Sequence, residues 1–416
     1  MLALLRRRPD FRRLWLGQVV SYLGDWLTYV AVSLIALASG DGLIAVALVL
    51  VAHTVPHAFL APLAGSLTDR MDRRKVMIWT ALLRGVLTIA MAAAAFGGSL
   101  WAVQGLLLLR VSVGAFFMPA QTAALPRLVE RDEIQLANAL TSVTWSVMFS
   151  LGVAAGGLVS ALVGPALAIA IDAVTFFGAA AVLWPLPAME PEGGLRDSRL
   201  GSVIRELHRD MAEAWRHAWA DPPLLEAVLA KTPVLAATGG AWVFLNQVAE
   251  DHSFAGSAAL TLGVLQTARG IGTGIGPLLE PKLEARTSTN VSWMVAAVLT
   301  FAAIAALPLS HQPVAMLTVV FLWGCGIGAN WVAATSRLQR VAPDALMGRL
   351  ASIDMMALTA GETITALLGA CLGEWLSDSR MAAWSAVAFG VAAWVLLRGL
   401  VRARLRVARA RPKVSP

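Results

Sequence analysis

Seven ionisable side chains interrupt the long apolar stretches of this 416-residue chain: Asp25, Arg84, Arg110, Asp172, Lys231, Arg269 and Glu362. A charged side chain at the centre of a bilayer costs about 2.5–3.5 kcal/mol when it faces lipid, so seven would together cost on the order of 20 kcal/mol. We therefore predict that they face a cavity or one another. Five of them form the predicted proton-coupling and cavity set: Asp25, Arg110, Asp172, Arg269 and Glu362.

The chemistry expected of such a set is proton transfer, with Asp25 as the favoured carrier. A carboxyl group that stands alone in a low-dielectric cavity can be protonated near neutral pH, whereas one held by an arginine stays charged. If Asp25 stands apart from Arg110, we expect it to carry the proton, with Arg110 competing only for the deprotonated form. If the two are tightly paired, Glu362 becomes the better carrier. For Arg84, Asp172 and Lys231, purely structural pairing is the alternative.

Further polar residues recur at helical spacing near these charges and predict a lined cavity. One stripe contains Gln18, Ser21, Asp25 and Thr28, a second contains Arg110, Gly114, Phe117 and Gln121, and a third contains Thr359, Glu362, Thr363 and Ala366. The predicted substrate cavity is lined by Gln18, Ser21, Thr28, His53, His57, Phe117, Gln121 and Thr359. His53 and His57 lie one helical turn apart, but a third ligand is not evident, so we predict cavity lining or packing and no metal site.

Other functional classes lack their signatures in this sequence. There is no Gly-x-x-x-x-Gly-Lys-Ser/Thr phosphate loop, and no Ser/His/Asp arrangement stands out. Glycines at 270–276 and 324–328 lie in apolar segments, follow no predicted strand, and favour close helix packing over dinucleotide binding. We therefore predict neither an enzyme nor a bound cofactor.

The composition places these residues in a membrane. Hydrophobic residues make up 58% of the chain and charged residues 14%, which excludes a soluble globule and a disordered chain. Long apolar runs without period-two alternation predict helices. The twelve predicted spans are 14–37, 42–64, 76–97, 100–121, 137–162, 165–187, 226–249, 257–279, 291–309, 313–335, 350–374 and 381–403.

The basic residues predict the orientation. The net charge is +7, yet 28 of the 33 lysines and arginines fall in loops or termini on one side of the twelve spans, and only Arg380 falls on the other. By the positive-inside rule both termini are predicted to be cytosolic. The net positive charge is therefore explained by membrane topology, and we predict no nucleic-acid partner.

The spans are expected to form two six-helix halves. The predicted divisions are a cytosolic N-terminus (1–13), an N-terminal bundle (14–188), a cytosolic linker with an amphipathic helix (189–225), a C-terminal bundle (226–403) and a basic cytosolic tail (404–416). Weak echoes displaced by about 211 positions, such as Gly65 and Gly276, indicate a duplication. Duplicated halves with a site near the midplane are typical of secondary transporters.

The loop at 65–75 contains Gly65, Leu67, Asp69, Arg70, Arg73 and Arg74, and here the chain resembles the major facilitator superfamily. The resemblance implies that these residues form a cytosolic gating latch, in which the acid at Asp69 docks on the terminus of the eleventh span. Residues such as Phe116 to Ala120, Asp172 to Phe176 and Leu338 to Pro343 resemble the branch of siderophore and macrolide exporters. The span-five sequence at 152–157 departs from the antiporter pattern because it has Val153 where that pattern has proline.

The resemblance and the residues together predict an all-α integral membrane protein of twelve helices in two pseudo-symmetric bundles. We expect a monomer in the bacterial inner membrane that exports a small amphiphilic compound by alternating access, with protons as the coupling ion. The alternatives are a lysophospholipid flippase and a solute importer of the same superfamily. The first is suggested because the order Gly24, Asp25 and Gly361, Glu362 also resembles the lysophospholipid transporters, which implies a lipid-like cargo.

Overall fold

The computed structural model describes residues 2–68, 71–130, 133–190, 200–343 and 346–410. Within these ranges the elements are helices joined by short turns, and no strand is present among them. The prediction of an all-α protein is thus confirmed.

The first half of the chain folds into helices that follow the predicted spans, some longer and some shorter at their ends. They are α1 (Leu2–Arg7), α2 (Pro9–Ala38), α3 (Gly42–Thr68), α4 (Arg73–Phe96), α5 (Leu100–Gly114), α6 (Phe117–Ala124), α7 (Ile134–Val163) and α8 (Pro165–Leu183). Pro9 and Pro165 occupy the first turns of α2 and α8, where a missing N–H costs nothing. Between α7 and α8, Gly164 has φ +85°, a backbone conformation that favours glycine.

The predicted span 100–121 is not one continuous helix, which corrects the expected polar stripe from Arg110 to Gln121. The helix α5 ends at Gly114, and the Phe116 N–H donates to the Val113 carbonyl at 3.3 Å before α6 begins at Phe117. Because this turn interrupts the helix, the spacing of 110, 114, 117 and 121 does not define a single helical face.

The second half begins with the linker helix α9 (Leu200–Ala220). It continues through α10 (Pro222–Val228), α11 (Thr232–His252), α12 (Ala258–Arg286), α13 (Thr289–Ala306), α14 (Pro313–Val341), α15 (Met347–Trp375) and α16 (Arg380–Ala410). Ser257 and Ser288 cap α12 and α13 by accepting the N–H groups of Leu260 and Val291. The helix α16 extends seven residues beyond the predicted span end at 403.

Eleven of the described helical segments are long and apolar enough to cross a membrane. The predicted span at 257–279 is also a helix, α12, but it is not one of the eleven. Its mean hydropathy is too low for that, because Arg269, Glu280 and several glycines lower it. Its glycines allow close packing instead. A Cβ at Gly272, Gly276 or Gly328 would meet backbone atoms of the neighbouring helix, and α12 accordingly packs along α14.

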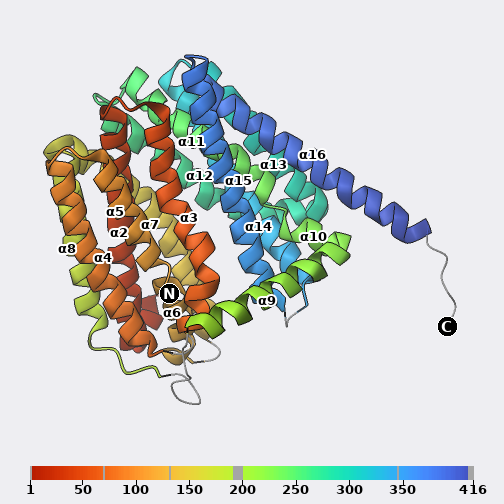
Figure 1. Cartoon of the computed structure of the whole chain (residues 1–416), viewed down its shortest axis with the longest axis horizontal. Helices are drawn as coiled ribbons and strands as arrows, with labels where there is room; N and C mark the ends of the chain where they lie inside the picture. Colours follow the sequence, from red (N-terminus) through yellow and green to blue (C-terminus); the bar gives the residue numbers. More distant parts are fainter. Residues whose placement is uncertain (1, 69–70, 131–132, 191–199, 344–345, 411–416) are drawn as a thin grey trace.

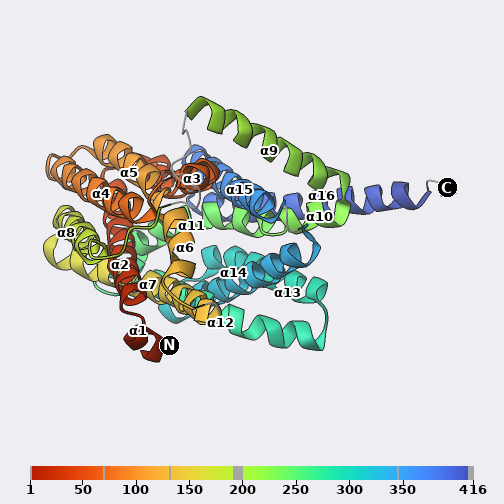
Figure 2. The same ribbon diagram turned by 90° about the horizontal axis from the view of Figure 1, so that it is seen from below.

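The two halves pack against each other mainly through α3 with α15 and α7 with α12 (Figures 1 and 2). We call the end of the bundle where α9 lies the linker end. At the opposite end the halves touch closely: the Ile44 N–H donates to Glu374 Oε1 at 3.1 Å, and a Cβ at Gly157 would lie 2.7 Å from the Ala259 carbonyl. The end away from the linker is therefore closed.

The helix α9 lies at the linker end beside α3 and α15 (Figure 2). Its apolar residues recur at helical spacing, which predicts an amphipathic helix lying at the cytosolic membrane face, and the structure adds a contact with protein. Ala214 and Ala218 are fully buried in a cluster with Leu338 and Leu350, and Arg349 Nη2 lies 3.0 Å from Asp210 Oδ2. Trp215 and Trp219 remain partly exposed. One face of α9 therefore docks on the C-terminal half.

Candidate functional site

Four charged side chains meet inside the N-terminal half. Asp25 of α2 accepts hydrogen bonds from Arg84 of α4 and from Arg110 of α5, the latter at 2.9 Å between Nη2 and Oδ1. Arg110 Nη1 also lies 2.6 Å from Oδ2 of Asp172 on α8. The spans that carry these residues are far apart in sequence, and helix packing brings their charges to one point. We call Asp25, Arg84, Arg110 and Asp172 the N-half cluster.

Neighbouring side chains form further hydrogen bonds and contacts with the four charged groups. Thr28 and Thr175 donate to the two Asp172 oxygens at 2.5 and 2.8 Å. The Phe176 ring lies 4.2 Å from the Arg84 guanidinium carbon, within range of a cation–π contact. Ser21 accepts from Arg84 at 3.3 Å. The two positive and two negative charges balance, so the cluster has no net charge.

This geometry meets the condition under which Glu362 is the better proton carrier. Asp25 is tightly paired with Arg110 and also with Arg84, so its charged form is held in place. The pairing anticipated as the alternative for Arg84 and Asp172 is also what the structure has. The role of either acid as a carrier stays a prediction.

Arg269 of α12 lies at the seam between the halves in a different environment. Its guanidinium carbon is 3.6 Å from the Trp242 ring centroid and 5.1 Å from the rings of both Phe149 and Trp323. Phe149 belongs to α7 of the N-terminal half, whereas the two tryptophans belong to α11 and α14. The Nε atom donates to Gln266 at 2.8 Å. Only 4% of Arg269 is exposed, so its charge is almost fully desolvated.

Glu362 of α15 resembles Arg269 in that it is buried and has no ion-pair partner among the described residues. It is 7% exposed, and among the described residues its carboxylate has neither a hydrogen bond nor an ion pair within 4.0 Å. Arg269 is close enough to act on it electrostatically. Its backbone lies directly against Gly239 of α11, where a Cβ could not fit. The helix is therefore fixed while the carboxyl group remains unpaired.

The remaining predicted cavity residues lie in several surroundings. His53 packs against Trp26 and Tyr29, with ring centroids 5.3 and 5.0 Å apart, and so lies near the seam. His57 and Arg84 both lie against Gly114. Gln18, Thr28, Gln121 and Thr359 are buried. Phe117 packs in the apolar cluster near the linker end that also contains Leu14, Val76 and Leu183. No group of three metal-ligating side chains occurs in the described part of the chain.

The predicted gating motif is described in part. Asp69 and Arg70 lie outside the described residues, whereas Gly65 and Leu67 end α3. The Arg73 N–H donates to the Met189 carbonyl at 3.2 Å, and Arg74 Nη2 donates to the Trp184 carbonyl. Both arginines therefore contact the chain that follows α8. Asp72 helps to hold the start of α4 against this segment, because its side chain caps α4 and also accepts the Met189 N–H at 3.1 Å.

Sequence reasoning missed several buried acids, Asp354 among them. Lys231 Nζ lies 2.5 Å from Asp354 Oδ2 and 4.5 Å from the Trp331 ring centroid. Asp354 precedes Glu362 by eight residues in the same apolar span, and that position was the available signal. Near the linker end, Glu226 is held by Arg337 and by Arg398, whose Nε lies 3.1 Å away.

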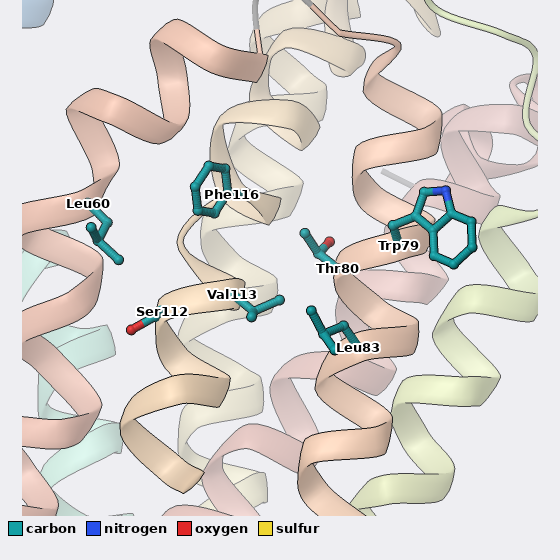
Figure 3. A pocket seen from close by; sticks show the side chains of 7 residues that line it. All are labelled: Leu60, Trp79, Thr80, Leu83, Ser112, Val113 and Phe116. Carbon is teal, nitrogen blue, oxygen red and sulfur yellow. The ribbon is translucent and has the colours of Figure 1, made fainter. Parts of the chain in front are cut away.

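An apolar groove of about 330 Å³ lies between α3, α4 and α5 (Figure 3). It is lined by Leu60, Trp79, Thr80, Leu83, Ser112, Val113 and Phe116. The Thr80 and Ser112 hydroxyls each donate to a carbonyl of their own helix at 2.8 Å, so they offer little to a ligand. Trp79 is 68% exposed, which places the groove on the outer wall, where lipid is expected.

Two bundles of membrane-spanning helices around buried charges define a membrane transporter, and comparison with known proteins gives the family. A family model described as "Transmembrane secretion effector" matches residues 2–412, so the chain belongs to that family within the major facilitator superfamily. It is a multi-pass membrane transporter and not an enzyme.

Two relatives are exporters by name. The enterobactin exporter EntS of Shigella boydii serotype 4 (strain Sb227) is 26% identical over 418 residues, which cover 99% of this chain and 96% of the relative. The putative bacilysin exporter BacE of Bacillus subtilis (strain 168) is 30% identical over 169 residues, 41% of this chain and 42% of the relative. The match to BacE therefore spans about two fifths of that protein.

Solved structures share the fold. A bacterial homologue of the human lysosomal transporter Spinster, inward-facing and unoccupied, has a TM-score of 0.73 at 14% identity, with 96% of this chain and 98% of that chain covered. A bacterial homologue of the iron transporter ferroportin, in an inward-facing state, has a TM-score of 0.70 at 14% identity, with 94% and 98% covered. The prediction of the major facilitator fold is confirmed.

Proposed function

We propose that this protein exports a small amphiphilic compound from the bacterial cytosol by alternating access, with Glu362 carrying the coupling proton. The observation that carries the proposal is the desolvated, unpaired carboxyl group of Glu362 at the seam of the two halves. A group in this position changes its charge and its surroundings when the halves rock about the site. Relatives that are exporters by name support the direction.

The proposed orientation places the linker end in the cytosol, as the basic loops indicate. The halves touch at the opposite end, so this conformation is inward-facing in the proposal. The latch of Asp69 and the following arginines is proposed to close the linker end in the alternate state. Reporter fusions near Gly194 and at Pro416 test the orientation, and a periplasmic signal from either fusion contradicts it.

Reconstituted proteoliposomes test the transport cycle. Liposomes of one orientation are loaded with a panel of amphiphilic compounds, and a pH gradient of either sign is imposed. We expect net cargo movement opposite to the proton flux, together with alkalinisation of the compartment that loses protons. Cargo movement in the same direction as the protons would indicate an importer instead. Movement of lysophospholipid between leaflets would favour the flippase alternative, which an amphiphilic cargo path also suits.

A further inference from the structure

Aromatic side chains from both halves form one continuous wall at the seam. In the N-terminal half, Trp26 and Phe149 lie 4.5 Å apart, and Trp145 stacks on Phe149 with centroids 5.8 Å apart. Tyr29 connects this group to Trp242 of the C-terminal half at 5.6 Å. Rings in such contact bury large apolar areas and offer flat faces to a bound molecule.

Arg269 is the cation set into this wall, and most of its donors have no acceptor. A guanidinium carries five N–H donors, and only Nε of Arg269 has a partner, the Gln266 oxygen. Among the described residues, neither terminal nitrogen has a hydrogen-bond partner, although the residue is 96% buried. The Phe149, Trp242 and Trp323 rings cover the guanidinium without supplying an acceptor.

Two neighbouring polar groups are also donors without acceptors. Gln266 Nε2 and Trp323 Nε1 are buried, and neither has a hydrogen-bond partner. Gln266 holds Arg269 through its oxygen, so its free amide can only donate. A buried donor left without an acceptor costs about 1–3 kcal/mol, and more when the group is charged. What the site lacks is an acceptor, above all an anionic one.

Charge balance leads to the same requirement. The N-half cluster contains two cations and two anions in direct contact, so it has no charge to offer a ligand. Arg269 has no carboxylate within ion-pair distance among the described residues, and Glu362 cannot neutralise it while protonated. A desolvated cation without a partner is unfavourable, and an anion that enters the seam removes that cost.

We propose that Arg269 binds the carboxylate of an anionic amphiphile whose apolar body lies against the seam tryptophans and Phe149. The planar guanidinium matches a carboxylate through two parallel hydrogen bonds, and one cation balances one negative charge. The aromatic wall accommodates a ring or chain beside that group. This inference rests on the proposed function because it names the class of cargo that the exporter takes, an organic acid in its ionised form.

The test uses three fluorescent probes that differ in charge on one skeleton: 1-pyrenebutyrate, its neutral primary amide and 1-pyrenebutylamine. Energy transfer from tryptophan to pyrene reports binding to the full-length protein in nanodiscs of neutral lipid at pH 7.5. We expect the carboxylate to bind at least about tenfold more tightly than the amide, which corresponds to one charge-assisted hydrogen bond. Tighter or equal binding of the amide or the amine would overturn the proposal.

Variants assign the preference to Arg269. We expect Arg269→Gln to lower carboxylate affinity to that of the amide, with amide affinity changed by less than about twofold, and Arg269→Lys to keep part of the preference. Arg337→Gln is the matched control, because it removes one cation of the same half that pairs with Glu226 instead. An undiminished carboxylate preference in Arg269→Gln, or equal loss in the control, would contradict the assignment.

A second measurement separates this inference from the proposed function. Pyrenebutyrate transport is followed in liposomes with and without an imposed pH gradient. If Arg269→Gln loses the carboxylate preference in binding while the wild type shows no proton-driven transport, the anion site stands and the coupling proposal fails. If transport is proton-driven but binding prefers the amide or the amine, the coupling stands and the anion site fails.

Discussion

The N-half cluster and the Arg269 region both contain buried arginines and carboxylates but differ in how their charges are paired. In the cluster, Asp25 and Asp172 are in contact with arginines at hydrogen-bond distance. In the second region, Arg269 lies among aromatic rings, and Glu362 of α15 has no ion-pair partner among the described residues. A closed set of charges holds four helices together, whereas an open set can exchange partners. Pairing, more than residue type, thus separates a structural charge from one available to a cargo or a proton.

The largest expected effect is on coupling. We predict that Glu362→Gln reduces proton-driven transport to the level of empty liposomes, because an amide cannot bind and release a proton. Gradient-independent exchange of cargo and thermal stability should remain close to wild type, because the carboxylate has no ion-pair partner to lose.

Glu250→Gln, an exposed acid near the end of α11, is the control for this measurement. The assignment of the proton to Glu362 is wrong if Glu362→Gln retains proton-driven transport while a well-folded Asp25→Asn loses it. In that case the paired acid of the N-half cluster would be the carrier.

The second effect is on stability. Arg110→Gln leaves Asp172 buried without its counter-charge, so we expect the free energy of unfolding to fall by about 3–5 kcal/mol. Arg269→Gln removes cation–π contacts but also a buried charge that has no ion-pair partner, so the two changes partly offset and its loss should be about 2 kcal/mol or less. Unfolding in detergent micelles, followed by the accessibility of buried cysteine Cys325, measures both.

The double variant Arg110→Gln/Asp172→Asn sharpens this result. It removes one charge of each sign, so it should recover a large part of the stability that Arg110→Gln loses. Equal losses in Arg110→Gln and Arg269→Gln would show that the two regions do not differ in pairing.

Hydropathy and charge placement predicted the architecture because these patterns act along the chain. The spans and the linker helix at Leu200–Ala220 followed from apolar runs and helical spacing. The tight pairing of Asp25 with Arg110 was only the alternative expectation, because spacing within one span does not give distances between spans. The turn after Gly114 was not predicted, because a helical pattern can continue across a short irregularity. The docking of α9 on the C-terminal half was missed because an amphipathic helix can bury its apolar face in lipid or in protein.

The seam was less predictable than either half. Arg269 was chosen as an intramembrane charge, but its surroundings depend on Phe149 and Trp323, which come from helices of opposite halves. No periodicity within one span reports which rings face which charge across an interface. The Lys231 and Asp354 contact lies within the C-terminal half, but it too joins different helices, since the two residues are 123 positions apart.

A third prediction compares two acids on the one helix α15. Asp354 is paired with Lys231, whereas eight residues later Glu362 is unpaired. We expect Asp354→Asn to cost about 1–3 kcal/mol of unfolding free energy, less than Arg110→Gln, because it breaks one ion pair, whereas Arg110→Gln breaks the contacts of two acids, Asp25 and Asp172. The double variant Lys231→Met/Asp354→Asn should recover this loss. A neutral Asp354→Asn would mean that the pair contributes no stability.

The smallest effect lies outside the membrane, where a paired acid fastens α1 to the bundle. Burial raises the pKa of Glu133. The Glu130 N–H and the Arg8 guanidinium, at 3.3 and 2.7 Å, lower it by more than burial raises it, so the pKa lies below the usual 4.5. A carboxylate with a lowered pKa stabilises the folded state above its usual value. That contribution disappears as the pH falls through the lowered value. Hydrogen exchange of the Arg8 amide, whose N–H donates to the Leu4 carbonyl at 2.9 Å, should therefore accelerate below pH 4.5 in the wild type after correction for intrinsic rates, because this bond opens when α1 is released. In Glu133→Gln the exchange should already be faster at neutral pH and should lose this acid limb. Glu130→Gln, which removes the more exposed partner of Arg8, should shift the exchange less. An identical acid limb in wild type and Glu133→Gln would show that this contact, unlike the N-half cluster, holds nothing in place.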